Sequence, residues 1–133
     1  MLNATAPIHQ FMTRSLLTVT PETALSEARE LMEANHLRYM PVVSRGRAVG
    51  ILRARSDAIV DDFGIFSGDG GTVQGAMTAD PACVPSSCPL RDVVHTMAHE
   101  AIAAVLVVDA GGELKGMFTD VDALKLLAMV LSD

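Results

Sequence analysis

The sequence predicts a mixed α/β (α+β) fold made of two β-α-β-β-α units that pack sheet to sheet with pseudo-two-fold symmetry. An internal repeat, the same order of helical and extended segments in each copy, and a hydrophobic content of 50% over 133 residues lead to this prediction. A unit of roughly 50 residues buries too little apolar surface to be stable alone, so the two copies are expected to share a core.

The repeat is visible in short identical or similar segments separated by a constant distance. Met12-Thr13 returns 65 positions later as Met77-Thr78, and Val42-Val43 returns as Val107-Val108. Self-similarity of this kind indicates that each copy is one supersecondary unit. The sequence is therefore divided into a first repeat over residues 8–60, a linker over 61–72 and a second repeat over 73–131.

The alignment shifts once within each repeat. Gly50 matches Gly116 at an offset of 66, because the second copy has one extra residue in the turn at 109–113. Asp57 matches Asp122 at the original offset, so the first copy is expected to carry one extra residue between Gly50 and Asp57.

The first copy begins with an extended stretch at 16–19 and a helix. Thr20, Pro21 and Glu22 suit the N-cap, the first helical position and the first turn. Apolar residues then recur at helical spacing, at Leu25, Ala28 and Met32. The β-rich runs 40–43 and 48–52 predict a hairpin, and a second helix is expected at about 57–62.

The second copy has the same order of segments. An extended stretch is expected at 82–84, followed by a helix whose apolar face includes Leu90, Val93, Val94 and Met97. A hairpin of strands 105–108 and 114–118 turns at Gly111-Gly112. The last helix is expected at about 120–131, with its apolar residues facing inward.

Composition argues against several classes of partner and location. A net charge of −6, no tryptophan and one tyrosine disfavour a nucleic-acid surface. No stretch approaches the roughly 18 apolar residues of a membrane helix, and the N-terminus lacks the pattern of a secretory signal, so a cytoplasmic protein without membrane attachment is expected. Cys83 and Cys88 fit neither a disulfide framework nor a zinc site, and no metal is expected.

Specific segments within each copy resemble one known family. The resemblance rests on the paired Met-Thr segments, on Tyr39-Met40-Pro41-Val42-Val43, and on the segment 116–122, Gly-Met-Phe-Thr-Asp-Val-Asp. The chain resembles a tandem pair of cystathionine-β-synthase (CBS) domains, often called a Bateman module, over roughly residues 8–131. Because little else is left over, a free-standing module is expected.

The resemblance implies a regulatory module that binds AMP, ADP, ATP or S-adenosylmethionine in clefts between the two repeats, requires no cofactor and forms a homodimer. In the better-preserved cleft, Asp122 would accept hydrogen bonds from the ribose hydroxyls and Thr119 would contact a phosphate at a helix start. Carried over from the family, the residues that the first repeat contributes to this cleft are Met12, Leu17, Leu37, Arg38 and Tyr39.

The other cleft departs from the family pattern. Counting from Gly50 puts Arg53 at the usual hydroxyl position and Ser56 at the aspartate position, and only an extra residue restores Asp57. The resemblance implies ligand contacts for Arg53, Asp57, Ala82, Ile102, Ala103 and Ala104. Because four arginines at 45, 47, 53 and 55 lie nearby, this cleft is expected to take a more highly charged ligand, or none.

Two other interpretations stay open. The Thr119-x-x-Asp122 pattern is also that of a capping box, which needs no ligand. The chain could therefore be a dimerisation or interaction module with empty clefts, acting on an unknown protein partner. An enzyme is disfavoured, because the sequence shows no pair of acid and base, no activated nucleophile and no cluster of metal ligands. No catalytic residue is predicted.

Overall fold

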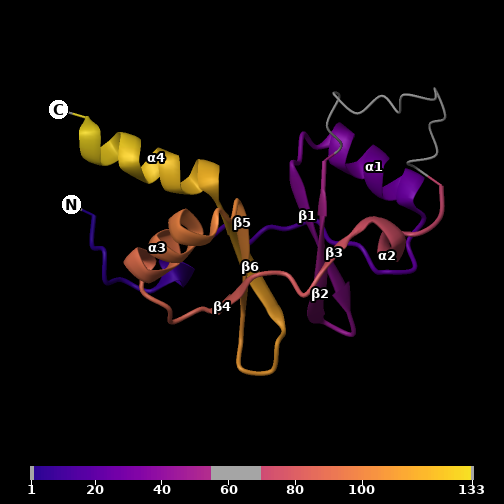
Figure 1. The fold of residues 1–133 in the computed structure, drawn as a ribbon, viewed down its shortest axis with the longest axis horizontal. Coiled ribbons are helices and arrows are strands. Elements are labelled where there is room, and N and C mark those ends of the chain that lie inside the picture. The colour runs from indigo at the N-terminus through magenta and orange to yellow at the C-terminus, as the bar shows by residue number, and fades with distance from the viewer. Residues whose placement is uncertain (1, 55–69, 133) are drawn as a thin grey trace. The chain divides into compact units, whose positions relative to one another are not determined.

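The computed structural model describes residues 2–54 and 70–132, which form two compact units (Figure 1). Of these residues, unit 1 contains 2–16, 46–48 and 81–132, and unit 2 contains 17–45, 49–54 and 70–80. The units cut across the sequence repeats. The first residues of the first repeat pack in unit 1 with most of the second repeat, and residues 73–80 pack in unit 2 with the first repeat.

Unit 2 is built on a sheet with strand order β1-β2-β3, formed by β1 (Tyr39–Ser44), β2 (Arg47–Arg53) and β3 (Thr78–Ala79). The predicted hairpin is confirmed as β1 and β2. The expected extended stretch at 16–19 contributes one parallel bridge, between Val19 and Val42. β3 was not predicted; it pairs antiparallel with β2, with Thr78 opposite Ile51.

The first helix, α1 (Leu25–Ala34), begins later than the sequence predicted. Thr20 is not its N-cap: the Thr20 N–H donates to the hydroxyl of Thr23 at 3.1 Å in a separate turn, and Ala24 is the capping residue. The hydroxyl that closes this turn is that of Thr23, and the Thr20 hydroxyl, which suggested a cap, shares a hydrogen bond of 3.0 Å with it. A short helix, α2 (Val73–Ala76), follows the undescribed segment.

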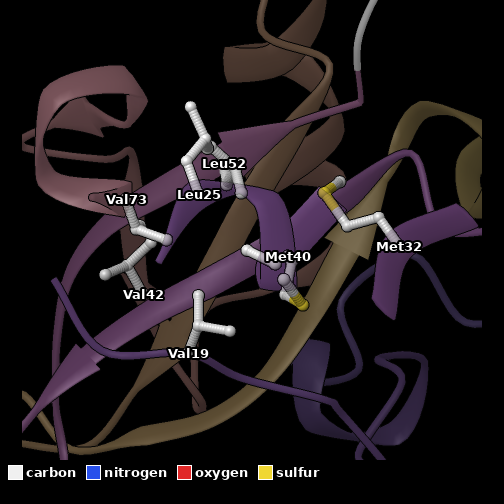
Figure 2. Packing of buried hydrophobic residues seen from close by; sticks show 8 residues of the cluster. Val19, Leu25, Met32, Met40, Val42, Leu52 and Val73 are labelled. Carbon is white, nitrogen blue, oxygen red and sulfur yellow. The ribbon is translucent and has the colours of Figure 1, made fainter. Parts of the chain in front are cut away.

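The core of unit 2 lies between α1 and one face of the sheet (Figure 1, Figure 2). The three predicted helix positions are buried, with exposed fractions of 2% or less. Figure 2 shows Leu25 and Met32 near Met40. The buried members of this core are Val19, Leu25, Ala28, Met32, Met40, Val42, Leu52 and Val73.

Unit 1 also has a three-stranded sheet, with strand order β4-β5-β6, formed by β4 (Cys83–Pro85), β5 (Ala104–Val108) and β6 (Leu114–Thr119). β4 pairs parallel with β5, and β5 pairs antiparallel with β6. Helix α3 (Leu90–Glu100) covers the core together with a 3₁₀ turn, η1 (Ile8–Gln10). The buried members of the core are Ile8, Leu90, Val93, Met97, Val105, Val107 and Phe118.

The final helix, α4 (Asp120–Leu131), has the predicted bounds, but most of its apolar residues are exposed and do not face inward as predicted. None of its residues is buried; Leu124 is 60% exposed and Met129 is 70% exposed. Ala123 and Leu126 pack against the core, which is too narrow a contact to cover a helix that is apolar on most sides. The helix expected at 57–62 lies outside the described residues.

Candidate functional site

Thr119 and Asp122 lie together where β6 ends and α4 begins. The Asp122 Oδ2 accepts hydrogen bonds from the Thr119 N–H at 2.9 Å and from the Thr119 hydroxyl at 3.1 Å. The Asp122 N–H donates in return to the Thr119 hydroxyl oxygen at 3.4 Å. These reciprocal contacts form a capping box and hold both side chains, half-buried, at the start of the helix.

Two small residues share this end of the sheet in unit 1. Ala104, the first residue of β5, lies opposite Thr119, and the carbonyl of Ala103 accepts a hydrogen bond from the Asp120 N–H at 2.8 Å. Ala82 and Ile102, which were also predicted to line a cleft, pack against the apolar core. The structure thus brings Thr119, Asp122, Ala103 and Ala104 to one sheet end.

Met12 contacts the same sheet at Gly116. The neighbouring Thr13 bridges Met117 by backbone hydrogen bonds of 2.9 and 3.0 Å, which lays the Met12 side chain across the glycine. A Cβ atom at Gly116 would collide with the Met12 sulfur and come within 2.9 Å of the Thr13 carbonyl oxygen. The glycine is needed for this close approach.

In unit 2, the predicted residues Leu37, Arg38 and Tyr39 lie where β1 begins. Leu37 packs against the core, and the Arg38 guanidinium lies 5.0 Å from the centre of the Tyr39 ring. The Ala54 N–H donates to the Arg38 carbonyl at 2.7 Å, so the end of β2, with Arg53, is adjacent. Leu17 is 44% exposed.

One residue at this end was missed by the sequence analysis. Arg29, on α1, donates from its guanidinium to the carbonyl of Arg53. Its place on the helix follows from periodicity, but its contact with a strand end 24 residues away depends on tertiary packing and leaves no local signal in the sequence.

The grouping of these residues into two shared clefts stays a prediction. Thr119, Asp122 and Met12 belong to unit 1, whereas Leu17, Leu37, Arg38 and Tyr39 belong to unit 2. Asp57 lies outside the described residues.

The described residues also carry features that bear on other chemistries. No cluster of three or more His, Cys, Asp or Glu side chains in the ranges 2–54 and 70–132 could hold a metal ion. Within those ranges no helix has the length and hydrophobicity to cross a membrane. Burial raises the pKa of both cysteine thiols, and the nearby Asp92 raises that of Cys88 further, which disfavours reactive thiolates.

Comparison with protein-family models shows to which family the chain belongs. The CBS domain family model matches twice, over residues 8–56 and 72–129. This chain belongs to the CBS domain family. The two matches begin at or next to η1 and α2, the segments that open the two repeats.

Curated CBS relatives include proteins of different lengths. The chain is 30% identical over 122 residues to an inosine-5'-monophosphate dehydrogenase of Korarchaeum cryptofilum, covering 92% of this chain and 24% of the relative. It therefore spans about a quarter of that enzyme. A CBS domain-containing protein of Dictyostelium discoideum is 27% identical, with 93% of this chain and 92% of the relative covered.

Solved structures show the same fold. An uncharacterized conserved protein from Pyrococcus horikoshii has a TM-score of 0.78 at 29% identity, with 99% of both chains covered. The protein CBSX2, solved in complex with AMP, has a TM-score of 0.79 at 23% identity, covering 96% of this chain and 99% of its own. The CBS domain pair of protein MJ0100 was solved in complex with 5-methylthioadenosine and S-adenosyl-L-methionine. It has a TM-score of 0.77 at 21% identity, covering 93% of this chain and 97% of its own.

Proposed function

We propose that this CBS pair is a regulatory module that binds an adenosine-containing ligand and passes the resulting conformational change to a partner protein. The observation that carries the proposal is the Thr119–Asp122 pair, because it holds a carboxylate and a hydroxyl at a helix start. AMP and S-adenosyl-L-methionine occur in complexes of proteins with this fold, which supports the ligand class.

The chemistry of the pair suits the sugar and phosphate of a nucleotide. Both hydrogen bonds that Thr119 donates to Asp122 end on Oδ2. A carboxylate has about four acceptor positions, so the Asp122 carboxylate has the capacity to accept from ribose hydroxyls as well. A helix N-terminus favours negative charge, but the N–H groups of Asp120, Val121 and Asp122 already donate to protein oxygens. The Thr119 hydroxyl would contact a phosphate oxygen by turning its proton from Asp122 Oδ2 to the phosphate.

The ligand would act by favouring one arrangement of the module over another. A ligand shifts such an equilibrium only by its difference in affinity for the two arrangements. α4 begins at the proposed ligand residues, so a change at Asp122 would be transmitted along this helix. We propose no catalytic residue, no cofactor and no enzymatic activity for the chain, and we propose a cytoplasmic location.

The proposed partner surface is α4, and we propose that a second copy of the chain covers it in a homodimer. Leu124, Leu127 and Leu131 are 60%, 49% and 72% exposed. An apolar groove of about 1050 Å³ lies beside this helix, between α4 and the N-terminal segment; it is lined by Leu2, Asn3, Ala6, Gln10, Phe11, Leu126, Met129 and Val130. Contiguous apolar surface of this kind favours association.

A thermal-shift series tests the proposed function. The protein is melted with AMP, ADP, ATP and S-adenosylmethionine, in parallel with Asp122→Ala and with Asp92→Ala, an exposed aspartate of the same unit, as matched control. A ligand at about 100 times its Kd stabilises the native state by about 2.7 kcal/mol. We expect a ligand-induced shift in the parent and in Asp92→Ala, and none in Asp122→Ala.

The alternative, an interaction module with empty clefts, predicts a different result. In that case no adenine ligand shifts the melting temperature at millimolar concentration, and Asp122→Ala lowers stability only through loss of the cap. The capping contacts of Asp122 are the observation that favours this second candidate.

A further inference from the structure

Helices α1 and α3 both begin without a side-chain cap, and in each the first N–H group donates to a distant backbone carbonyl. In unit 1 the Leu90 N–H donates to the carbonyl of Ala6 at 2.9 Å. In unit 2 the Leu25 N–H donates to the carbonyl of Gly71, also at 2.9 Å. Both carbonyls lie just before a CBS domain match, so each helix is capped by the segment that opens the other repeat.

The N-terminal segment, residues 4–13, is held along the loop that precedes α3. Pro7 pairs with Pro89 in an antiparallel bridge. The Ile8 side chain has an exposed fraction of 0% and belongs to the core of unit 1. Further backbone bonds run from the Arg91 N–H to the Ala4 carbonyl at 2.9 Å, from the Ile8 N–H to the Cys88 carbonyl at 2.7 Å and from the His9 N–H to the Ser86 carbonyl at 3.2 Å. The segment therefore completes both the first turn of α3 and the core of unit 1.

The far end of the N-terminal segment pairs with the edge of the sheet in unit 1. Thr13 and Met117 exchange backbone hydrogen bonds of 2.9 and 3.0 Å, and the Met12 side chain lies across Gly116. We define the docking surface as residues 86–91 together with this edge of β6. Because these partners are distant along the chain, the bonds between segment and surface do not depend on a covalent connection between them.

The connection that follows the N-terminal segment has no regular structure. Residues 14–18 form neither helix nor strand; Leu16 is half-buried and the other four are exposed. The chain passes from unit 1 to unit 2 between Leu16 and Leu17. An exposed connection of this kind allows identical segments to be exchanged between copies at low cost, because every contact of the segment is kept.

We propose that the docking surface also accepts the N-terminal segment of a second copy, which gives a dimer with exchanged segments. The same backbone bonds and the same burial of Ile8 form in both arrangements, so concentration decides between them. A segment on a short linker has an effective concentration in the millimolar range, so exchange is expected when the protein refolds at high concentration. This proposal goes beyond the proposed function, because it requires neither a ligand nor contact through α4.

Cross-linking between two single-cysteine chains tests the exchange. Positions 7 and 89 form the type of antiparallel pair whose Cα atoms are about 4.5 Å apart, which suits a disulfide. Pro7→Cys and Pro89→Cys are therefore made in separate chains. In both chains the native Cys83 and Cys88 are replaced by alanine. The two chains are mixed, unfolded in urea, refolded together at about 1 mM protein and oxidised with glutathione disulfide.

Two controls calibrate the yield of the linked pair. One chain that carries both Pro7→Cys and Pro89→Cys should form its disulfide internally, which checks that the positions pair. Pro7→Cys mixed with Glu100→Cys, at the opposite end of α3, measures cross-linking by chance. Both prolines are half-buried, so the variants are expected to fold, which circular dichroism melting checks.

We expect a disulfide-linked pair of chains from the Pro7→Cys and Pro89→Cys mixture, with a yield at least about tenfold above the Glu100→Cys control. The yield should fall roughly in proportion to the protein concentration during refolding, because exchange competes with docking within one chain. A yield no higher than the control would overturn the proposal. Failure of the double variant to close would also overturn it, because positions 7 and 89 would then not be paired. Neither result bears on ligand binding.

Discussion

Thr119 and Asp122 are joined by three hydrogen bonds, two donated by Thr119 to Asp122 Oδ2 and one donated by the Asp122 N–H to the Thr119 hydroxyl oxygen. The same two side chains therefore stabilise the start of α4 and form the proposed ligand site. A substitution at either position should change both the stability of the free protein and the affinity for ligand.

Thr119→Ala is expected to lower the free energy of unfolding by about 1 kcal/mol, because it removes the capping hydroxyl. It should also weaken adenine-nucleotide binding, because the same hydroxyl is proposed to turn its proton from Asp122 to the phosphate when the ligand binds. Thr119→Ser retains the oxygen and should restore both properties. Chemical denaturation measures the free energy of unfolding, and calorimetry measures the ligand affinity. If Thr119→Ser is as unstable as Thr119→Ala and binds the ligand as weakly, the hydroxyl has neither the capping nor the binding role.

Gly50 and Gly116 should not tolerate a methyl group. A Cβ atom at Gly50 would lie 2.5 Å from the sulfur of Met77 and 3.0 Å from the Thr78 carbonyl oxygen. Overpacking of this kind costs about 1–3 kcal/mol, and backbone is less able to move than the end of a methionine. Gly50→Ala and Gly116→Ala are therefore expected to lower the melting temperature.

Gly75→Ala is the control for these two variants, since a Cβ at Gly75 meets nothing within 4 Å. It should be neutral or slightly stabilising in the same melting experiment. Equal stability for all three variants would show that the contacts with Met77 and Met12 do not require glycine at positions 50 and 116.

Asp109 is expected to stabilise the turn between β5 and β6 in a pH-dependent way. Its Oδ1 accepts hydrogen bonds from the N–H groups of Gly111 and Glu113, both at 2.9 Å. Backbone hydrogen bonding from Glu113 is the main cause that lowers the pKa of Asp109. A lowered pKa means that the stabilisation is present above the ordinary aspartate pKa and is lost as the pH falls toward the lowered value.

The measurement is a comparison of Asp109→Ala with the parent by thermal melting across acidic and neutral pH. The difference in melting temperature should be present at pH 7 and should shrink as the pH falls below the ordinary aspartate range. A difference that does not change with pH would contradict a role for the ionised carboxylate.

Leu127→Glu is expected to shift the protein from dimer to monomer without unfolding it, because no residue of α4 is buried within the chain. A charge in an apolar interface loses its hydration without a partner. Sedimentation velocity measures the oligomeric state. Ala110→Glu, in the exposed turn between β5 and β6, adds the same charge elsewhere and should leave the dimer intact; a monomeric parent would refute the proposed homodimer.

Most of the fold could be predicted from the sequence because its signals are local. The two hairpins follow from β-rich runs around turns, and α1 and α3 bury the positions that their spacing selected, such as Leu25 and Met97. The prediction that Thr20 is the N-cap is wrong because its hydroxyl bonds with the hydroxyl of Thr23, which closes a separate turn before α1. β3 was missed because Thr78–Ala79 is too short for a periodic signal and is a strand only through pairing with β2.

The candidate site could be predicted in part. Thr119 and Asp122 are three positions apart, so their contact is encoded locally and was anticipated as a capping box. The exposed face of α4 was predicted to point inward because periodicity identifies an apolar face without saying what covers it. Arg29 could not be predicted from the sequence, because its contact with Arg53 joins a helix to a strand end that is distant in the sequence.

The most direct test of the proposed function is calorimetric titration of AMP, ADP, ATP and S-adenosylmethionine into the parent and into Asp122→Asn. Asparagine keeps an oxygen that can accept from the Thr119 N–H, so the cap is largely retained while the carboxylate charge is lost. The account predicts that the parent binds at least one of these ligands and that Asp122→Asn binds it at least about tenfold more weakly, with melting temperatures of the free proteins nearly unchanged. Equal affinity of the two proteins for that ligand, or no binding of any of the four by the parent, would contradict it.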